Sequence, residues 1–326
     1  MESRQPIDKR AAVMMIMVCA IWGLQQVAIK VAAEAVSPML QIALRSGIAA
    51  VMVGLLLLLR RYRTKCRVET WRGGIIVGVL FAAEYLAVSV GLGYTSAAHM
   101  VIFLYTAPVF AAIGLHFRFP GERLSRVQWT GILLAFIGIA VAFYTPGKPG
   151  DGWVTPQRMG DALGVLGAIA WGATTVSIRC SKLAEAPAPL TLFYQLAGAC
   201  LILGIVAVVT GQNRLHLSGI AFASLTFQTV VFSFLSLLVW FWLLGRYLGS
   251  RLGVLSFLTP LFGVGFGVWL LGDPLEAPFV LGALLVLVGI AVVSGQDLLR
   301  ARSVAPNTQN PAKTPPIPRA PRAQCR

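Results

Sequence analysis

Charged residues are scarce in this chain. Asp, Glu, Lys and Arg make up only 12% of its 326 residues, whereas 57% are hydrophobic. Soluble domains carry about 25% charged residues. The shortage of charge excludes an ordinary soluble domain and predicts a polytopic membrane protein that exposes apolar side chains to lipid.

Sequence signatures of enzymes and metal sites are also missing. The chain has no G-x-x-x-x-G-K-[ST] loop, no G-x-S-x-G elbow and no H-E-x-x-H pair. Its three histidines and five cysteines show neither ligand spacing nor a C-x-x-C pair. We therefore expect no ATP hydrolysis, no enzyme activity, no cofactor, no metal ion and no disulfide framework.

The chain consists instead of long apolar stretches joined by short connections. Such segments need internal hydrogen bonding in lipid, which helices or closed barrels provide. The alternating polarity of barrel strands is not found. The sequence therefore predicts an all-α membrane protein with ten transmembrane helices. The expected spans are 11–33, 38–59, 73–93, 97–117, 127–145, 160–178, 188–210, 221–244, 252–271 and 278–296.

The two halves of the chain resemble each other. Trp22-Gly23 is followed by Lys30, and Trp171-Gly172 is followed at the same spacing by Arg179. Each half also carries five apolar stretches, and because five is odd, the second half enters the membrane with opposite orientation. Two inverted five-helix repeats are typical of alternating-access transporters.

The placement of basic residues supports this topology. With the N-terminus inside, the inner segments hold 22 of the 27 Lys and Arg residues and the outer loops hold 3. Basic residues concentrate on the cytoplasmic side of membrane proteins. We therefore expect both termini in the cytoplasm. The basic residues that give the net charge of +15 flank the spans. Their position predicts contact with membrane lipid and no nucleic-acid partner.

The domain boundaries follow from the same pattern. We expect a cytoplasmic N-terminal segment (1–10), a first five-helix repeat (11–145) and an outer linker (146–159). A second repeat (160–297) precedes a basic, Pro-rich tail (298–326). The composition of the tail favours solvated disorder, with contact to anionic lipid as the alternative.

Each half also places a proline-containing span before an acidic turn. Pro108 precedes Glu122, and Pro260 precedes Asp273. Proline removes a backbone hydrogen bond and kinks a helix, so Pro108 and Pro260 are candidate hinges for gating, with static kinks as the alternative. The two acidic residues are expected to cap the helices that follow them. We expect His99, at the start of the fourth span, to be solvated.

These motifs together resemble the EamA-type family of the drug/metabolite transporter superfamily. The resemblance covers residues 10–297. It implies a ten-helix carrier of the bacterial inner membrane that moves small metabolites, often amino acids or their relatives, usually outward. It also implies a central cavity lined by the first, third, fourth, sixth, eighth and ninth spans. Asp273, in place of Glu, and Glu84 depart from the family pattern.

Equivalent helix faces of the first and sixth spans carry aromatic and polar residues. Polar groups in hydrocarbon cost several kcal/mol, so both faces should point into the bundle. They line a cavity there or, alternatively, hold helices together. The candidate substrate-binding residues on these faces are Trp22, Gln25, Gln26, Trp171, Thr174 and Thr175.

Glu84 is the remaining candidate for substrate binding. It is the only carboxylate near the middle of an expected span, and a charge there costs at least about 2.5 kcal/mol. Burial favours the protonated form and makes Glu84 a candidate for proton coupling. The alternative is a structural ion pair with Arg45 of the second span.

These observations favour a secondary carrier that exports a small polar or amphipathic metabolite by alternating access. Transport would be driven by the gradient of the substrate or of protons. A channel and an intramembrane enzyme are the alternatives. A channel needs a continuous polar lining, and an enzyme needs clustered acid–base or metal groups. The residues leave open whether the carrier is a monomer or a homodimer.

Overall fold

The computed structural model describes residues 8–59, 65–120, 123–143, 155–216, 218–247, 252 and 255–303. Within these ranges every extended regular element is a helix, apart from an isolated bridge between Val36 and Leu215. The elements are α1 (Lys9–Val31), α2 (Pro38–Leu59), α3 (Lys65–Gly91), α4 (Ala97–Leu104), α5 (Ala107–Arg118), α6 (Arg126–Ala142), α7 (Pro156–Arg179), η2 (Lys182–Ala184), α8 (Ala188–Val209), α9 (Gly219–Thr226), η3 (Phe227–Ser236), α10 (Leu237–Arg246), α12 (Leu258–Leu271) and α13 (Ala277–Ser303).

The helices coincide in place with the apolar stretches of the sequence. Among the described residues, seven helices are long and apolar enough to cross a membrane. Three shorter apolar helices lie at the fifth, ninth and tenth expected spans: Arg126–Ala142, Leu258–Leu271 and Ala277–Val293. The all-helical architecture is therefore confirmed, while the count of ten crossings and their inverted arrangement stay predictions.

Several expected segments fall largely outside the described ranges. These are residues 1–7 of the N-terminal segment, residues 146–154 of the linker, Glu122 of the first acidic turn, and residues 304–326 of the tail. Helix α13 continues to Ser303, where the sequence predicts the start of a disordered tail.

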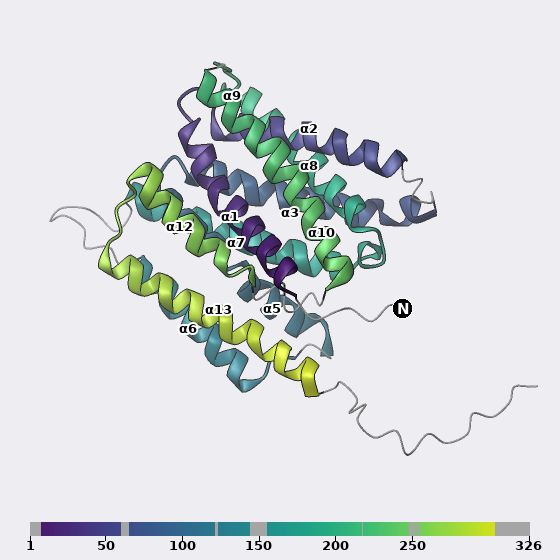
Figure 1. Ribbon diagram of the computed structural model, residues 1–326, viewed down its shortest axis with the longest axis vertical. Helices are drawn as coiled ribbons and strands as arrows, with labels where there is room; N and C mark the ends of the chain where they lie inside the picture. The colour runs from purple at the N-terminus through teal and green to yellow at the C-terminus, as the bar shows by residue number, and fades with distance from the viewer. Residues whose placement is uncertain are drawn as a thin grey trace, which may run out of the picture.

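The helices form a bundle with two outer pairs (Figure 1). Helices α6 and α13 pack along each other on one side, and α2 packs on α8 on the other. Helices α1, α3, α7 and α12 lie between these pairs, with α1 against α12 and α3 against α7. This central group positions the side chains of the candidate site.

Glycine brings the backbones of α6 and α13 together. A Cβ atom on Gly282 would lie 2.5 Å from the backbone nitrogen of Ala142 and 2.5 Å from the carbonyl oxygen of Gly138. Real Cβ atoms do not approach so closely. Small residues that permit such contact are a common basis of helix association in membranes.

The fourth expected span, which the structure places at Ala97–Arg118, is interrupted in its middle. Helix α4 ends at Leu104, and α5 starts at Ala107 with Pro108 in its first turn. Pro260 likewise lies in the first turn of α12. A proline is tolerated there because the first amide groups of a helix lack intrahelical partners. Each proline therefore follows a break in its expected span, and the role of Pro108 and Pro260 as hinges stays a prediction.

The eighth expected span contains a feature that the sequence did not indicate. Between α9 and α10, the ten residues of η3 form a π-helix. π-Helices are rare overall, but those that occur are often found at functional sites. Their wider turns displace side chains from the positions that they would have in an α-helix. Here the wider turn carries Phe232, Ser233 and Ser236 toward α1 and α2.

Candidate functional site

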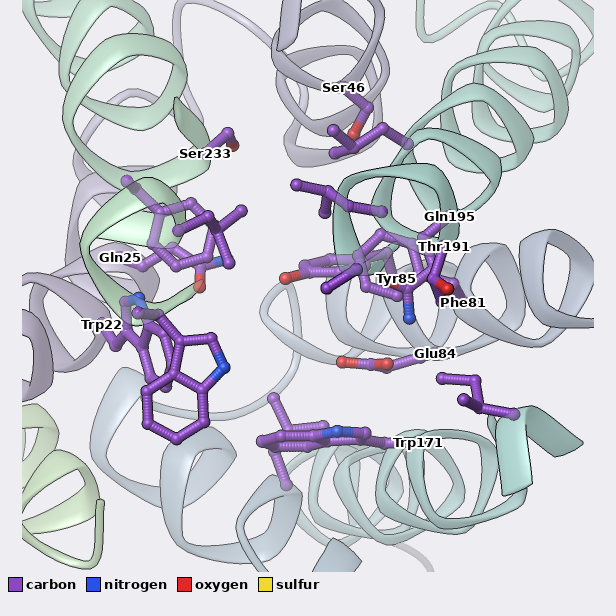
Figure 2. A pocket seen from close by; sticks show the side chains of 18 of the residues that line it. Trp22, Gln25, Ser46, Phe81, Glu84, Tyr85, Trp171, Thr191, Gln195 and Ser233 are labelled. Atoms are coloured by element: carbon purple, nitrogen blue, oxygen red, sulfur yellow. The ribbon is translucent and has the colours of Figure 1, made fainter. Parts of the chain in front are cut away.

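A cavity of about 510 Å³ lies in the middle of the bundle. Its wall comes from α1, α2, α3, α7, α8, η3 and α10, and from the junction of α4 and α5. Figure 2 shows side chains from these elements converging on the cavity. Small-molecule sites typically measure 300–1,000 Å³ and combine apolar walls with a few polar groups. The volume therefore suits a metabolite-sized ligand.

Aromatic side chains form much of the wall. Trp22 and Trp240 meet edge to face with ring centroids 5.5 Å apart, and Trp171 meets Tyr105 at 5.3 Å. The indole Nε1–H of Trp22 donates a hydrogen bond to Ser236 Oγ (2.8 Å). The cavity therefore offers ring faces and edges held in fixed orientations, which suits a planar or apolar ligand group.

Arg45 is a buried cation that the protein itself holds in place. The side chain is 2% exposed. Its guanidinium carbon lies 4.7 Å from the ring centroid of Tyr85 and 4.9 Å from that of Phe232. With its amide oxygen turned toward the guanidinium, Gln25 accepts hydrogen bonds from Nη1 (2.8 Å) and Nη2 (3.0 Å). Rings and an amide thus replace the solvent around this charge.

Glu84 lines the same cavity and is only 4% exposed. Its Oε2 atom has no hydrogen-bond partner in the described structure. The positive charge of Arg45 acts on this carboxylate, although the pair is not among the direct ion pairs of the described residues. The alternative of a structural ion pair with Arg45 therefore stays open. Figure 2 shows the carboxylate pointing into the cavity between Tyr85 and Trp171.

Most predicted site residues lie at this cavity, but two do not. Its lining includes Trp22, Gln25, Gln26, Glu84 and Trp171. The two threonines of α7 are absent from it. Thr174 Oγ1 donates to the carbonyl oxygen of Ala170 (2.9 Å), and Thr175 Oγ1 donates to that of Trp171 (3.2 Å). Thr174 and Thr175 are therefore not in the cavity wall of this conformation, and their part in substrate binding stays a prediction.

The cavity also contains polar residues that we did not select from the sequence. Ser46 of α2, Thr191 and Gln195 of α8, and Ser233 of η3 belong to its wall. Polar side chains inside apolar spans were the available signal. Helical spacing within each span did not show which of them face the same space.

A second buried polar cluster lies where α4 begins. His99 Nδ1 lies 3.1 Å from both carboxylate oxygens of Asp161, and Thr95 donates a short hydrogen bond to Asp161 Oδ1. The His99 ring stacks on Phe279 with centroids 3.7 Å apart. His99 is 1% exposed, so the expectation of a solvated His99 is wrong.

Two further groups close this end of the bundle. Lys30 Nζ donates to the carbonyl oxygen of Thr95 (2.7 Å), and the Ala98 amide donates to Asp273 Oδ2 (3.0 Å). Asp273 therefore caps α4, and not the helix that follows it as predicted. Because Tyr105 at the other end of α4 lines the cavity, the cluster is about 12 Å from the cavity along the helix.

Comparison with known proteins identifies relatives over nearly the whole chain. The model of the EamA-like transporter family matches residues 9–144 and again residues 158–295. The "Uncharacterized transporter YoaV" of Bacillus subtilis is 24% identical over 276 residues, which cover 84% of this chain and 93% of that protein. A "Probable amino-acid metabolite efflux pump" of Escherichia coli is 25% identical over 301 residues, 88% of this chain and 95% of that protein.

The fold also matches a solved structure. A protein described only as "Crystal structure of protein" aligns with a TM-score of 0.62 and 20% identity. The alignment covers 94% of this chain and 100% of that chain. At this identity the likeness bears on the fold alone.

Proposed function

The chain belongs to the EamA-like transporter family, and on that premise we propose that it is a secondary active transporter that exports a small metabolite across the bacterial inner membrane. The metabolite is amino-acid-like or a related amphipathic compound. One observation carries the proposal: a metabolite-sized cavity, walled by rings and buried polar groups from both halves of a multi-pass membrane protein.

The orientation of the cavity supports export by alternating access. Part of its wall is the end of α7, at Arg179, and the connection from α7 to α8, at Leu183. The distribution of basic residues assigns this connection to the cytoplasm. The opposite end is closed by the cluster around Asp161. In this proposal the conformation is open toward the cytoplasm, ready to load a substrate for export.

The movement to an outward-open state would use the helix breaks. The helical segment is interrupted between α4 and α5 at Tyr105 and Thr106, and α12 starts anew at Leu258. Hinges are commonly found at the ends of elements, where a few residues absorb the change in backbone angles. Pro108 and Pro260 would then set where each moving segment starts. Tyr105 borders the cavity, so substrate contact and bending would share one site.

Glu84 provides a route for coupling to protons in this scheme. Its carboxylate faces the cavity and has an oxygen without a partner. A proton or a cationic substrate group would neutralise it in turn, so that outward movement of one could accompany inward movement of the other.

Counterflow in proteoliposomes tests the proposed function. Liposomes that contain the purified protein are loaded with unlabelled phenylalanine or phenethylamine and diluted into a trace of the labelled compound. A carrier exchanges internal for external molecules, so we expect a saturable, transient accumulation of label. A channel would equilibrate the label without accumulation. Conversion of the compound would indicate an enzyme. Either result would refute the carrier.

A further inference from the structure

We propose that Glu84 and the rings beside it form a subsite for a protonated amine, so that the transported compound is an organic amine with a planar or apolar group. This inference rests on the proposed function, because it specifies the substrate class of the same cavity.

The buried cavity atoms that lack a hydrogen-bond partner indicate which kind of ligand group would bind there. Among the described residues, two buried side-chain atoms without a hydrogen-bond partner belong to cavity-lining residues: Glu84 Oε2 and Gln26 Oε1. Both are oxygen atoms that accept hydrogen bonds. An ammonium group has three donors and no acceptor. A protonated amine therefore supplies what these atoms lack, whereas a carboxylate or phosphate would add further acceptors.

The surrounding charges also favour a cation at Glu84. An ionised carboxylate that is 4% exposed is costly without a partner. The guanidinium of Arg45 already donates to Gln25 and lies over the rings of Tyr85 and Phe232. These contacts already use part of the hydrogen-bonding capacity of Arg45, whereas Glu84 Oε2 has no partner. A ligand cation in the cavity would add positive charge directly at this carboxylate and compete there with a proton.

The rings next to Glu84 complete the subsite. The carboxylate projects between Tyr85 and Trp171 (Figure 2). An ammonium group at the carboxylate would lie close to these rings, and ring faces attract cations. The apolar part of the same ligand would extend toward the Trp22 and Trp240 pair, which is held edge to face.

The test compares two ligands of similar shape and opposite charge. Isothermal titration calorimetry at neutral pH measures the binding of phenethylamine, a cation, and of 3-phenylpropionate, an anion, to the purified full-length protein. We expect the amine to bind at least tenfold more tightly than the anion. Equal affinities, tighter binding of the anion, or no binding of the amine would overturn the subsite, and none of these results depends on a variant.

Substitution at position 84 then assigns the effect to this carboxylate. Glu84→Gln keeps the shape and removes the charge, so amine affinity should fall at least tenfold while anion affinity stays within about threefold. Glu84→Asp keeps a carboxylate and should retain part of the amine affinity. Glu34→Gln is the matched control, because Glu34 is exposed and is not a cavity residue. Wild-type amine affinity in a folded Glu84→Gln variant would overturn the assignment.

The counterflow assay separates this inference from the proposed function. Amine binding that depends on Glu84, without saturable counterflow, would preserve the subsite and refute the carrier. Saturable counterflow of phenylpropionate, without amine binding, would preserve the carrier and refute the subsite.

Discussion

Two buried carboxylates in this bundle have opposite environments. Asp161 is 0% exposed, and both of its oxygens lie 3.1 Å from His99 Nδ1, with Thr95 as a further donor. Glu84 is 4% exposed, and one of its oxygens has no partner. A fully paired buried group stabilises one conformation, whereas an unpaired one raises the energy of the empty state. The comparison suggests that the Asp161 end keeps the bundle closed and that the Glu84 end awaits a ligand.

Helices α1 and α7, which carry the repeated Trp-Gly motif, also differ in their polar contacts. Trp22 of α1 bonds to Ser236, and Gln25 holds Arg45. In α7, Trp171 borders the cavity, but Thr174 bonds to the backbone of its own helix. Equivalent positions of a repeat therefore need not carry equivalent chemistry.

The largest effect is expected from the paired carboxylate. Asp161→Ala leaves the buried side chains of His99 and Thr95 without their acceptor, and each buried group left unsatisfied costs about 1–3 kcal/mol. We expect a marked loss of thermal stability in detergent and easier labelling of a cysteine placed at this end of the bundle.

The control for this prediction is Glu34→Ala. Glu34 is an exposed carboxylate, and its removal should change stability by less than about 0.5 kcal/mol. If Asp161→Ala were as stable as this control, the cluster around Asp161 would not hold the bundle closed.

The unpaired carboxylate should respond in the opposite direction. Glu84→Met replaces a buried acceptor without a partner by an apolar side chain of similar length. Leaving such a group unsatisfied costs about 1–3 kcal/mol, so the variant should unfold at a higher temperature than the wild type. Amine counterflow should be lost in the same preparation. A Glu84→Met protein less stable than the wild type would show that Glu84 is already paired in the empty state.

The positions of the helices were predictable, because lipid imposes long apolar segments that are visible without any contact information. The partners of the polar residues were not. His99 reads as an isolated residue in the sequence, since Asp161, which pairs with it, is 62 positions away. The π-helix at Phe227–Ser236 has no marker in composition. Helical spacing places Thr174 on the same face as Trp171, but it does not show that a short hydroxyl side chain bonds to its own backbone.

A smaller effect is expected at the hydrogen bond between Trp22 and Ser236. Trp22→Phe removes the indole donor that lies 2.8 Å from Ser236 Oγ, and a neutral hydrogen bond contributes about 0.5–1.5 kcal/mol. Ser236→Ala removes the acceptor. A double-mutant cycle on stability should give a coupling energy in this range. Additive effects of the two substitutions would mean that the bond adds no stability.

The smallest effect is expected at Thr174, and a substitution there tests the difference between α1 and α7. Thr174→Val keeps the shape of a 1% exposed side chain and removes a hydroxyl that bonds to Ala170. Such bonds to the preceding turn slightly destabilise helices, so stability should change by less than about 0.5 kcal/mol. Amine affinity should stay within about threefold, whereas Trp22→Phe alters the wall directly and should weaken binding more. A large loss of affinity in Thr174→Val would instead require Thr174 to face the ligand in another conformation, and α7 would then contribute to binding as α1 does.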